Sequence, residues 1–287
     1  MKYSLLILFL CSIVTIQAQD KKSNNVFDTF KDRRVINSHS VETLQKRQLD
    51  IRIAHRFGDL AGDNGGWDNF YGLENAADVL IGAEYGATDN LTVGLFRTKG
   101  AANFNAIING QAKYRILRQK EEGMPVTLSV LGFTGVSTAK KGDDPEQLNF
   151  YDETAHRFVH GAQILLARKF SNLFSLQISP SFIHRNVVLF GEENNIISIG
   201  AATRIQLTKV IGILADVNLP ISGLQDKGDA TIPFGLGFEF DTGGHVFQLN
   251  FTNTKGLSAV DYIPNTTSKW GDGEFRMGFT ISRLFNL

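Results

Sequence analysis

The sequence has 287 residues, of which 29 are basic and 29 acidic, so its formal net charge is zero. This balance argues against nucleic acid as a partner, because surfaces that bind nucleic acid are strongly basic. Hydrophobic residues make up 43% of the chain. That average does not exclude a membrane protein, because a transmembrane β-barrel is apolar at only every second strand position.

Residues 1–18 are predicted to form a cleaved signal peptide. Lys2 supplies the basic start, and residues 5–16 form an apolar run. The run is shorter than the ~20 residues that a transmembrane helix needs. Cys11 is the only cysteine, and residues 8–10 before it are too large for a good lipoprotein signal. The mature chain is therefore predicted to contain no disulfide and no cysteine metal site.

Residues 19–46 are charged and show no regular hydrophobic period. Three interpretations of this segment stay open, namely a periplasmic tail, a short helix, or a plug inside the lumen of a barrel. An exported chain without a membrane helix is expected in the periplasm, outside the cell, or in the outer membrane as a barrel.

From Leu49 onward, apolar residues recur at every second position, which is typical of β-strands. In the first such segment Leu49 and Ile51 share one face, while Asp50 and Arg52 share the other. Counting similar segments gives about twelve strands, an even number as in bacterial single-chain barrels. Residues 47–287 are therefore predicted to form one all-β domain, a single transmembrane, antiparallel, up-and-down β-barrel.

The connections between the predicted strands alternate in length. Short links at residues 88–90, 171–172, 208–209 and 242–244 alternate with longer ones such as 58–78, 139–156 and 253–272. Outer-membrane barrels have short periplasmic turns and long external loops. This alternation therefore favours a membrane barrel over a soluble β-sandwich.

Four stretches in the first third of the chain are distinctive: residues 37–44, the HRFG run at 55–58, residues 72–78, and YGATDNLTVGL at 85–95. Together they resemble the opening of an uncharacterised family of outer-membrane β-barrels of Gram-negative bacteria. The rest of the chain resembles that family by pattern only. The resemblance implies a barrel in the outer membrane, and it implies no activity or catalytic residue, because the family has no known function.

The candidate site consists of charged side chains at the polar strand positions, which are predicted to line the lumen. Either they form a polar network satisfied internally, or they surround a narrow pore or pocket. Twelve strands lie between the ~8 that barely hold one small ligand and the ~16–18 that enclose a channel. The candidates are Asp50, Arg52, Arg56, Glu84, Lys113, Arg115, Lys169, Arg204, Asp216, Glu239 and Arg276.

The predicted function is a narrow channel, or a barrel that binds or transports a small solute. One alternative is a structural barrel that docks a periplasmic or surface partner. The other is a lipid-hydrolysing outer-membrane enzyme, which is disfavoured because His160 is the only candidate base on the lipid face near mid-strand and has no evident serine partner. No enzyme activity, catalytic residue, metal or cofactor is predicted. Expected partners are outer-membrane lipid, the barrel-insertion machinery during assembly, and a small solute.

Overall fold

The computed structural model of the chain describes residues 24–100, 106–188, 190–224 and 230–287. The predicted signal peptide lies outside these residues. No helix in the described ranges is long and apolar enough to cross a membrane.

Within the described residues, twelve strands form one closed barrel in which every neighbouring pair is antiparallel. The strands follow chain order around the wall, and the last pairs with the first, so the predicted fold is confirmed. They are β3 (Gln48–Phe57), β4 (Ala76–Gly86), β5 (Leu91–Thr98), β6 (Ile107–Leu117), β7 (Thr127–Ser137), β8 (Phe158–Lys169), β9 (Phe174–Arg185), β10 (Asn195–Gln206), β11 (Ile211–Ser222), β12 (Phe234–Asp241), β13 (His245–Thr252) and β14 (Arg276–Asn286).

The two faces of the wall differ as the alternating sequence predicts. In β3, Asp50 and Arg52 are fully buried inside the barrel, whereas Ile51 and Ile53 are 42% and 43% exposed on its outer surface. Such an apolar outer band suits contact with lipid. Arg283 shares the outer face of β14, and its guanidinium lies 4.9 Å from the centre of the Phe285 ring.

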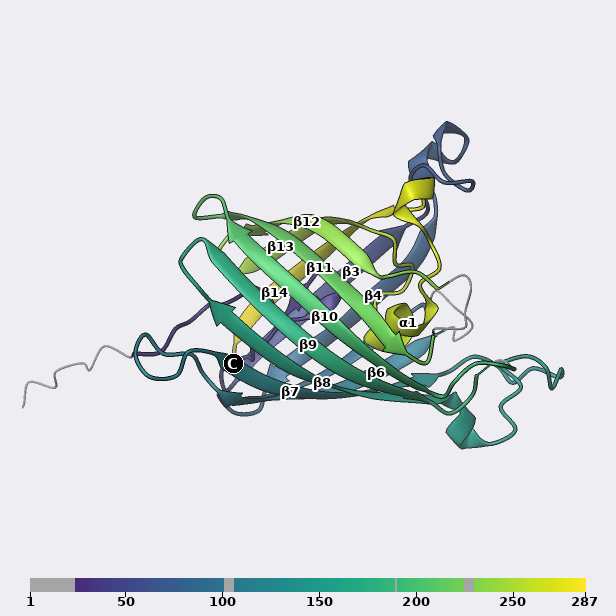
Figure 1. Cartoon of the computed structure of the whole chain (residues 1–287), viewed down its shortest axis with the longest axis horizontal. Helices are drawn as coiled ribbons and strands as arrows, with labels where there is room; N and C mark the ends of the chain where they lie inside the picture. The colour runs from purple at the N-terminus through teal and green to yellow at the C-terminus, as the bar shows by residue number, and fades with distance from the viewer. Residues whose placement is uncertain (1–23, 101–105, 189, 225–229) are drawn as a thin grey trace, which may run out of the picture.

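The connections are sorted by length between the two ends of the barrel. Tight turns join β4 to β5, β8 to β9, β10 to β11 and β12 to β13, and the C-terminus lies at this turn end (Figure 1). The opposite, loop end carries the short helices η1 (Trp67–Gly72), η2 (Thr154–Arg157), η3 (Trp270–Asp272) and the helix α1 (Ala259–Asn265). The alternation of short and long connections predicted from the sequence is therefore present.

Two further strands, β1 (Arg34–Val35) and β2 (Ser38–His39), pair only with each other in a hairpin inside the barrel. They belong to residues 29–44, here named the N-terminal segment, which is largely buried. The interior is also less uniformly polar than the sequence suggests. Inward side chains of β7 to β11, including Leu131, Leu165, Ile183 and Leu214, form an apolar cluster with the N-terminal segment and α1.

Candidate functional site

The N-terminal segment enters the barrel from the turn end. Just before it, the backbone N–H of Val26 donates to the carbonyl of Gln119 in the β6–β7 connection, at 2.8 Å. After it, the N–H of Arg47 donates to the carbonyl of Gly86 at the end of β4, at 2.9 Å. Both ends of the segment are therefore anchored at one mouth, and the hairpin between them projects into the lumen.

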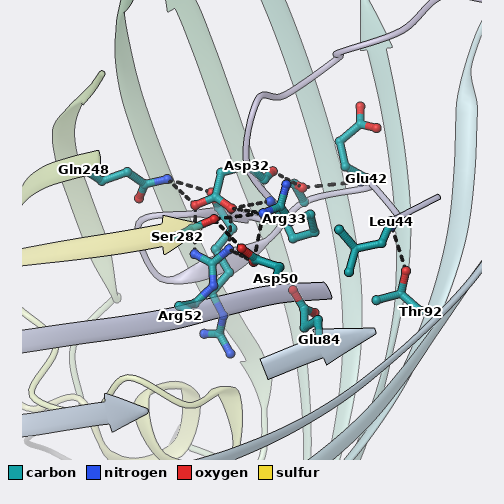
Figure 2. Close-up of polar contacts among 12 residues, drawn as sticks. Asp32, Arg33, Glu42, Leu44, Asp50, Arg52, Glu84, Thr92, Gln248 and Ser282 are labelled. Atoms are coloured by element: carbon teal, nitrogen blue, oxygen red, sulfur yellow. Dashed lines mark hydrogen bonds and ion pairs between the residues drawn. The ribbon is translucent and has the colours of Figure 1, made fainter. Parts of the chain in front are cut away.

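An ionic cluster holds the first half of the N-terminal segment, through Asp32 and Arg33, against β3, β13 and β14 (Figure 2). Arg33 lies 2.8 Å from the carboxylate of Asp50, and Arg52 lies 3.0 Å from the same carboxylate. Arg52 also pairs with Asp32, whose carboxylate accepts a hydrogen bond of 3.1 Å from Gln248. Two acidic and two basic side chains are thus interlocked with no exposed partner, which offsets the desolvation cost of burying them.

The charge of Asp32 is maintained by its neighbours. Burial alone raises the pKa of a carboxyl group. At Asp32 the guanidinium of Arg52, and then that of Arg33, outweigh burial and lower the pKa of the carboxyl below its usual value. The segment therefore presents a carboxylate to β3 at neutral pH.

Asp216 on β11 binds the tip of the hairpin. Its carboxylate accepts hydrogen bonds from the backbone N–H groups of Asn37, at 2.9 Å, and Ser38, at 2.7 Å. From the other side, Arg56 donates to the side-chain oxygen of Asn37, at 3.0 Å. The tip is therefore fixed between two separate strands of the wall, β11 and β3.

The long connection between β13 and β14 folds into the lumen from the loop end. Its helix α1 is buried through Val260, Tyr262 and Ile263. The backbone N–H of Leu257 donates to Asp78 of β4, at 2.8 Å. The carbonyl of Leu257 accepts a hydrogen bond of 2.9 Å from Arg34 of the hairpin. The two inserted segments thus meet inside the barrel and occlude it from both ends.

The hairpin matches a lumen with two kinds of wall. Phe30, Val35, Ile36 and Val41 belong to the same apolar cluster as the inward side chains of β7 to β11. The consecutive charged residues 32–34 face the polar groups of β3, β13 and β14 and the β13–β14 connection. One short segment therefore satisfies both the apolar and the charged side of the interior.

The structure brings five of the eleven predicted lumen residues into direct contact with the N-terminal segment. These are Asp50, Arg52, Arg56, Lys113 and Asp216. The ammonium group of Lys113 donates to the backbone carbonyls of Ser40, at 2.7 Å, and Glu42, at 3.0 Å. These five side chains therefore bind the hairpin and do not pair only with one another.

The other six predicted residues form hydrogen bonds and ion pairs with partners outside the N-terminal segment. Arg204 and Glu239 pair with each other at 2.7 Å, and Arg276 pairs with Asp59 of the β3–β4 loop. Three more have neutral partners: Glu84 accepts from Gln111, Arg115 donates to the carbonyl of Asp89, and Lys169 donates to the carbonyl of Phe27.

His160, the candidate base of the enzyme alternative, lies on the outer face of β8. Its Nδ1 is 3.0 Å from the hydroxyl of Thr134 on β7, and His184 of β9 is its cross-strand neighbour. In the described part of the chain, the hydroxyl group that contacts this imidazole belongs to a threonine and not to a serine. The site with the densest polar contacts is inside the barrel.

A family model described as "Membrane bound beta barrel domain (DUF5777)" matches residues 30–285. The chain belongs to this family. It is therefore a membrane-bound β-barrel, and the predicted family resemblance is confirmed. The family domain starts at residue 30, so it includes most of the N-terminal segment together with the barrel.

Solved structures similar to this family member are distant. The NanC porin is 10% identical with a TM-score of 0.48, covering 83% of this chain and all, 100%, of that one. An outer membrane channel from Pseudomonas putida F1 is 13% identical with a TM-score of 0.45, covering 85% and 97%. A mutant porin of Rhodopseudomonas blastica is 9% identical with a TM-score of 0.33, covering 73% and 56%. No curated protein sequence matches the chain. Function must therefore be argued from the interior of this family member itself.

Three residues of the site were not among the predicted ones, namely the plug residues Asp32 and Arg33 and the neutral wall residue Gln248. A signal was present, because residues 32–34 read Asp-Arg-Arg in a segment without hydrophobic period. Those charges complement Asp50 and Arg52 at inward positions of the first strand. Gln248 carried no such signal, since an amide at a polar strand position has no preferred partner.

Proposed function

We propose that this membrane-bound barrel is a narrow outer-membrane channel for small polar solutes, closed in the present state by the N-terminal segment acting as a plug. The observation that carries the proposal is how the segment is held. Its strands β1 and β2 pair only with each other, and its links to the wall are ion pairs and side-chain hydrogen bonds. The segment can therefore leave the lumen without breaking a hydrogen bond of the barrel sheet.

The wall that the plug covers supports this function. The eleven lumen candidates are proposed to line the pore once the plug leaves, because charged side chains in an apolar interior are costly unless they are paired or hydrated. Water entering from the turn end would replace the partners that the plug supplies. A twelve-stranded frame leaves room for a small solute but not for a wide channel.

The same proposal implies a location and a set of partners for the protein. A closed barrel with an apolar outer face leaves no backbone group exposed to lipid, which is the condition for spanning a bilayer with strands. We infer the outer membrane, reached through the predicted signal peptide, with lipid around the barrel and insertion machinery needed during assembly. The transported partner is a small solute.

A reversible lock tests the plug. The amide of Asn218 lies 3.1 Å from the hydroxyl of Ser38, so Ser38→Cys with Asn218→Cys places two thiols across the plug–wall contact. The full-length double variant is reconstituted in planar bilayers. We expect no conductance under oxidising conditions and discrete channel openings after reduction. The single variant Ser38→Cys controls for oxidation itself.

The lock has two outcomes that would reject the proposal. A disulfide-locked protein that conducts as well as the reduced protein would show that the plug does not close the pore. A reduced protein that never conducts, at any voltage or pH, would show that the barrel is not a channel.

A further inference from the structure

The barrel wall holds the second half of the plug, residues 37–44, mainly through hydrogen bonds to the plug backbone. Gln177 donates to the carbonyl of His39, at 2.7 Å, and Ser129 donates to the carbonyl of Val41, at 2.8 Å. The hydroxyl of Thr92 accepts from the N–H of Leu44, at 2.8 Å. With Asp216 and Lys113, the backbone partners come from five different strands of the wall.

Gln248 repeats this kind of contact on the other half of the hairpin. Its amide nitrogen donates to the carbonyl of Arg34, at 3.0 Å, and its amide oxygen accepts from the N–H of Ile36, at 3.4 Å. A single side chain thus satisfies a carbonyl and an N–H group of the plug backbone where the hairpin begins to turn, at Ile36 with a φ of 55°.

Two wall residues of opposite charge bind the backbone towards the two ends of residues 37–42. A carboxylate, Asp216, binds two N–H groups at residues 37 and 38, and an ammonium group, Lys113, binds two carbonyls at residues 40 and 42. The outermost of these contacts, at residues 37 and 42, are five residues apart along the chain, as are the two ends of a hexapeptide. The spacing and the order of charges suit the free amino end and the free carboxyl end of a short peptide.

Buried backbone groups must be satisfied in any protein, but most are satisfied by other backbone groups. Here the barrel wall uses side chains, and it contacts atoms that every peptide has. We propose that the lumen of the open channel binds short peptides, with the amino end at Asp216 and the carboxyl end at Lys113, and that the plug is a tethered mimic of this substrate. This inference rests on the proposed channel function, because the plug must leave before a free peptide can enter.

The first test measures competition in the full-length wild-type protein. The probe is the free hexapeptide with the sequence of residues 37–42, and a serine–alanine hexapeptide of unrelated sequence is the second probe. Each peptide should bind the transiently open state of the protein. Amide hydrogen exchange in residues 37–44 should therefore become roughly tenfold faster when the peptide concentration is about tenfold above the Kd for that state. The same serine–alanine peptide with N-methylated backbone amides should have a smaller effect, because it keeps the carbonyls but lacks the N–H group that Asp216 binds at residue 38.

The second test assigns the charges of the site. Lys113→Gln and Asp216→Asn should each reduce the acceleration caused by peptide, measured relative to the exchange rate of the same variant without peptide. Lys209→Gln is the matched control, because Lys209 is an exposed lysine in the turn between β10 and β11, outside the lumen. Lys209→Gln should leave the peptide effect unchanged.

The outcomes separate this inference from the channel proposal. Conductance in the reduced lock variant with no peptide effect at the solubility limit would overturn peptide binding and leave the channel in place. Equal acceleration by the N-methylated peptide would also overturn it. Peptide-accelerated exchange without any conductance would support the binding site and reject transport.

Discussion

The carboxylate of Asp32 and the guanidinium of Arg52 form an ion pair in which neither side chain is exposed to solvent. Nη1 of Arg52 lies 2.8 Å from one carboxylate oxygen, and Nη2 contacts the other. Bidentate pairs of this kind combine charge with a fixed geometry. Since Asp32 belongs to the plug and Arg52 to β3, the pair is a direct link between the mobile part that we propose and the rigid wall.

Removing one partner of this pair should loosen the plug. Asp32→Asn keeps the shape of the side chain but leaves Arg52 with less compensation, and breaking one side of a buried pair costs about 3–5 kcal/mol. Amide exchange in residues 29–44 should accelerate strongly, while exchange in the barrel strands stays slow. Asp28→Asn is the control, because Asp28 pairs with Lys31 with more than half of its side chain exposed. Equal effects of the two substitutions would show that the pair does not hold the plug.

A methyl group added under the hairpin tip should have a similar effect without changing any charge. A Cβ at Gly235 of β12 would lie 2.7 Å from both the carboxylate of Asp216 and a methyl group of Ile36. Gly235→Ala should therefore displace the tip and raise exchange in residues 36–38. Gly132→Ala is the matched control, since a Cβ there meets nothing within 4 Å. Unchanged exchange in Gly235→Ala would mean that the tip is not seated against β12.

The placement of the outer surface in the bilayer can be tested by substituting two residues of β10 that are expected at different depths. Ile199 lies near the middle of β10 and is 42% exposed, whereas Ile205 is close to its turn end and is 41% exposed. Arginine at the bilayer midplane costs roughly 2–4 kcal/mol, and this cost falls towards zero near the interface. Ile199→Arg should thus reduce the free energy of unfolding in lipid much more than Ile205→Arg. Similar losses at both positions would contradict the expected placement of β10 in the bilayer.

The barrel could be predicted because its signals are local. Asp50 and Arg52 were assigned to the inner face from the alternation of their own strand, and the structure places both inside. The position of residues 29–44 had no such signal. Asn37 and its partner Asp216 are 179 residues apart, and the contact depends on the closed wall being present first.

The apolar part of the lumen was missed for a related reason. Leu131, Leu165 and Leu214 sit at inward positions and pack against the plug and α1. In a barrel with an empty lumen, apolar residues at those positions would face water. They become favourable only when an inserted segment covers them, so a strand pattern read alone could not explain them.

The pH dependence of the plug follows from His39. Burial lowers the pKa of its imidazole well below 6.5, and the nearby cations Arg34, Lys113 and Arg52 lower it further. Released into water, the plug would bind a proton near pH 6.5. The closed state therefore binds fewer protons than the released state. The contribution of His39 to the stability of the closed state is complete above about pH 6.5 and is lost progressively as the pH falls from there towards the lowered pKa of its imidazole. The carboxylate of Asp32 in the same segment stays charged, because Arg52 and Arg33 lower the pKa of this carboxyl below its usual value.

Amide exchange of residues 29–44, corrected for the intrinsic effect of pH, should be faster at about pH 5.5 than at about pH 7.5. His39→Gln should remove most of this difference, because glutamine does not titrate. A variant that keeps the full pH dependence would assign it to other groups and exclude His39 as its cause.

Ion selectivity follows from which lumen charges keep a partner when the plug leaves. Seven of the eleven lumen candidates are basic and four are acidic. The ammonium of Lys113 loses the carbonyls of Ser40 and Glu42, and Arg115 donates to the carbonyl of Asp89 and not to a carboxylate in the described residues. Charged walls set pore selectivity, so the open channel should be weakly anion-selective. Reversal potentials in a salt gradient, measured in the Asp32→Asn background, should shift towards neutrality in Lys113→Gln/Arg115→Gln, but not in Arg283→Gln on the outer face. A cation preference, or no shift in the double variant, would remove Lys113 and Arg115 from the conduction path.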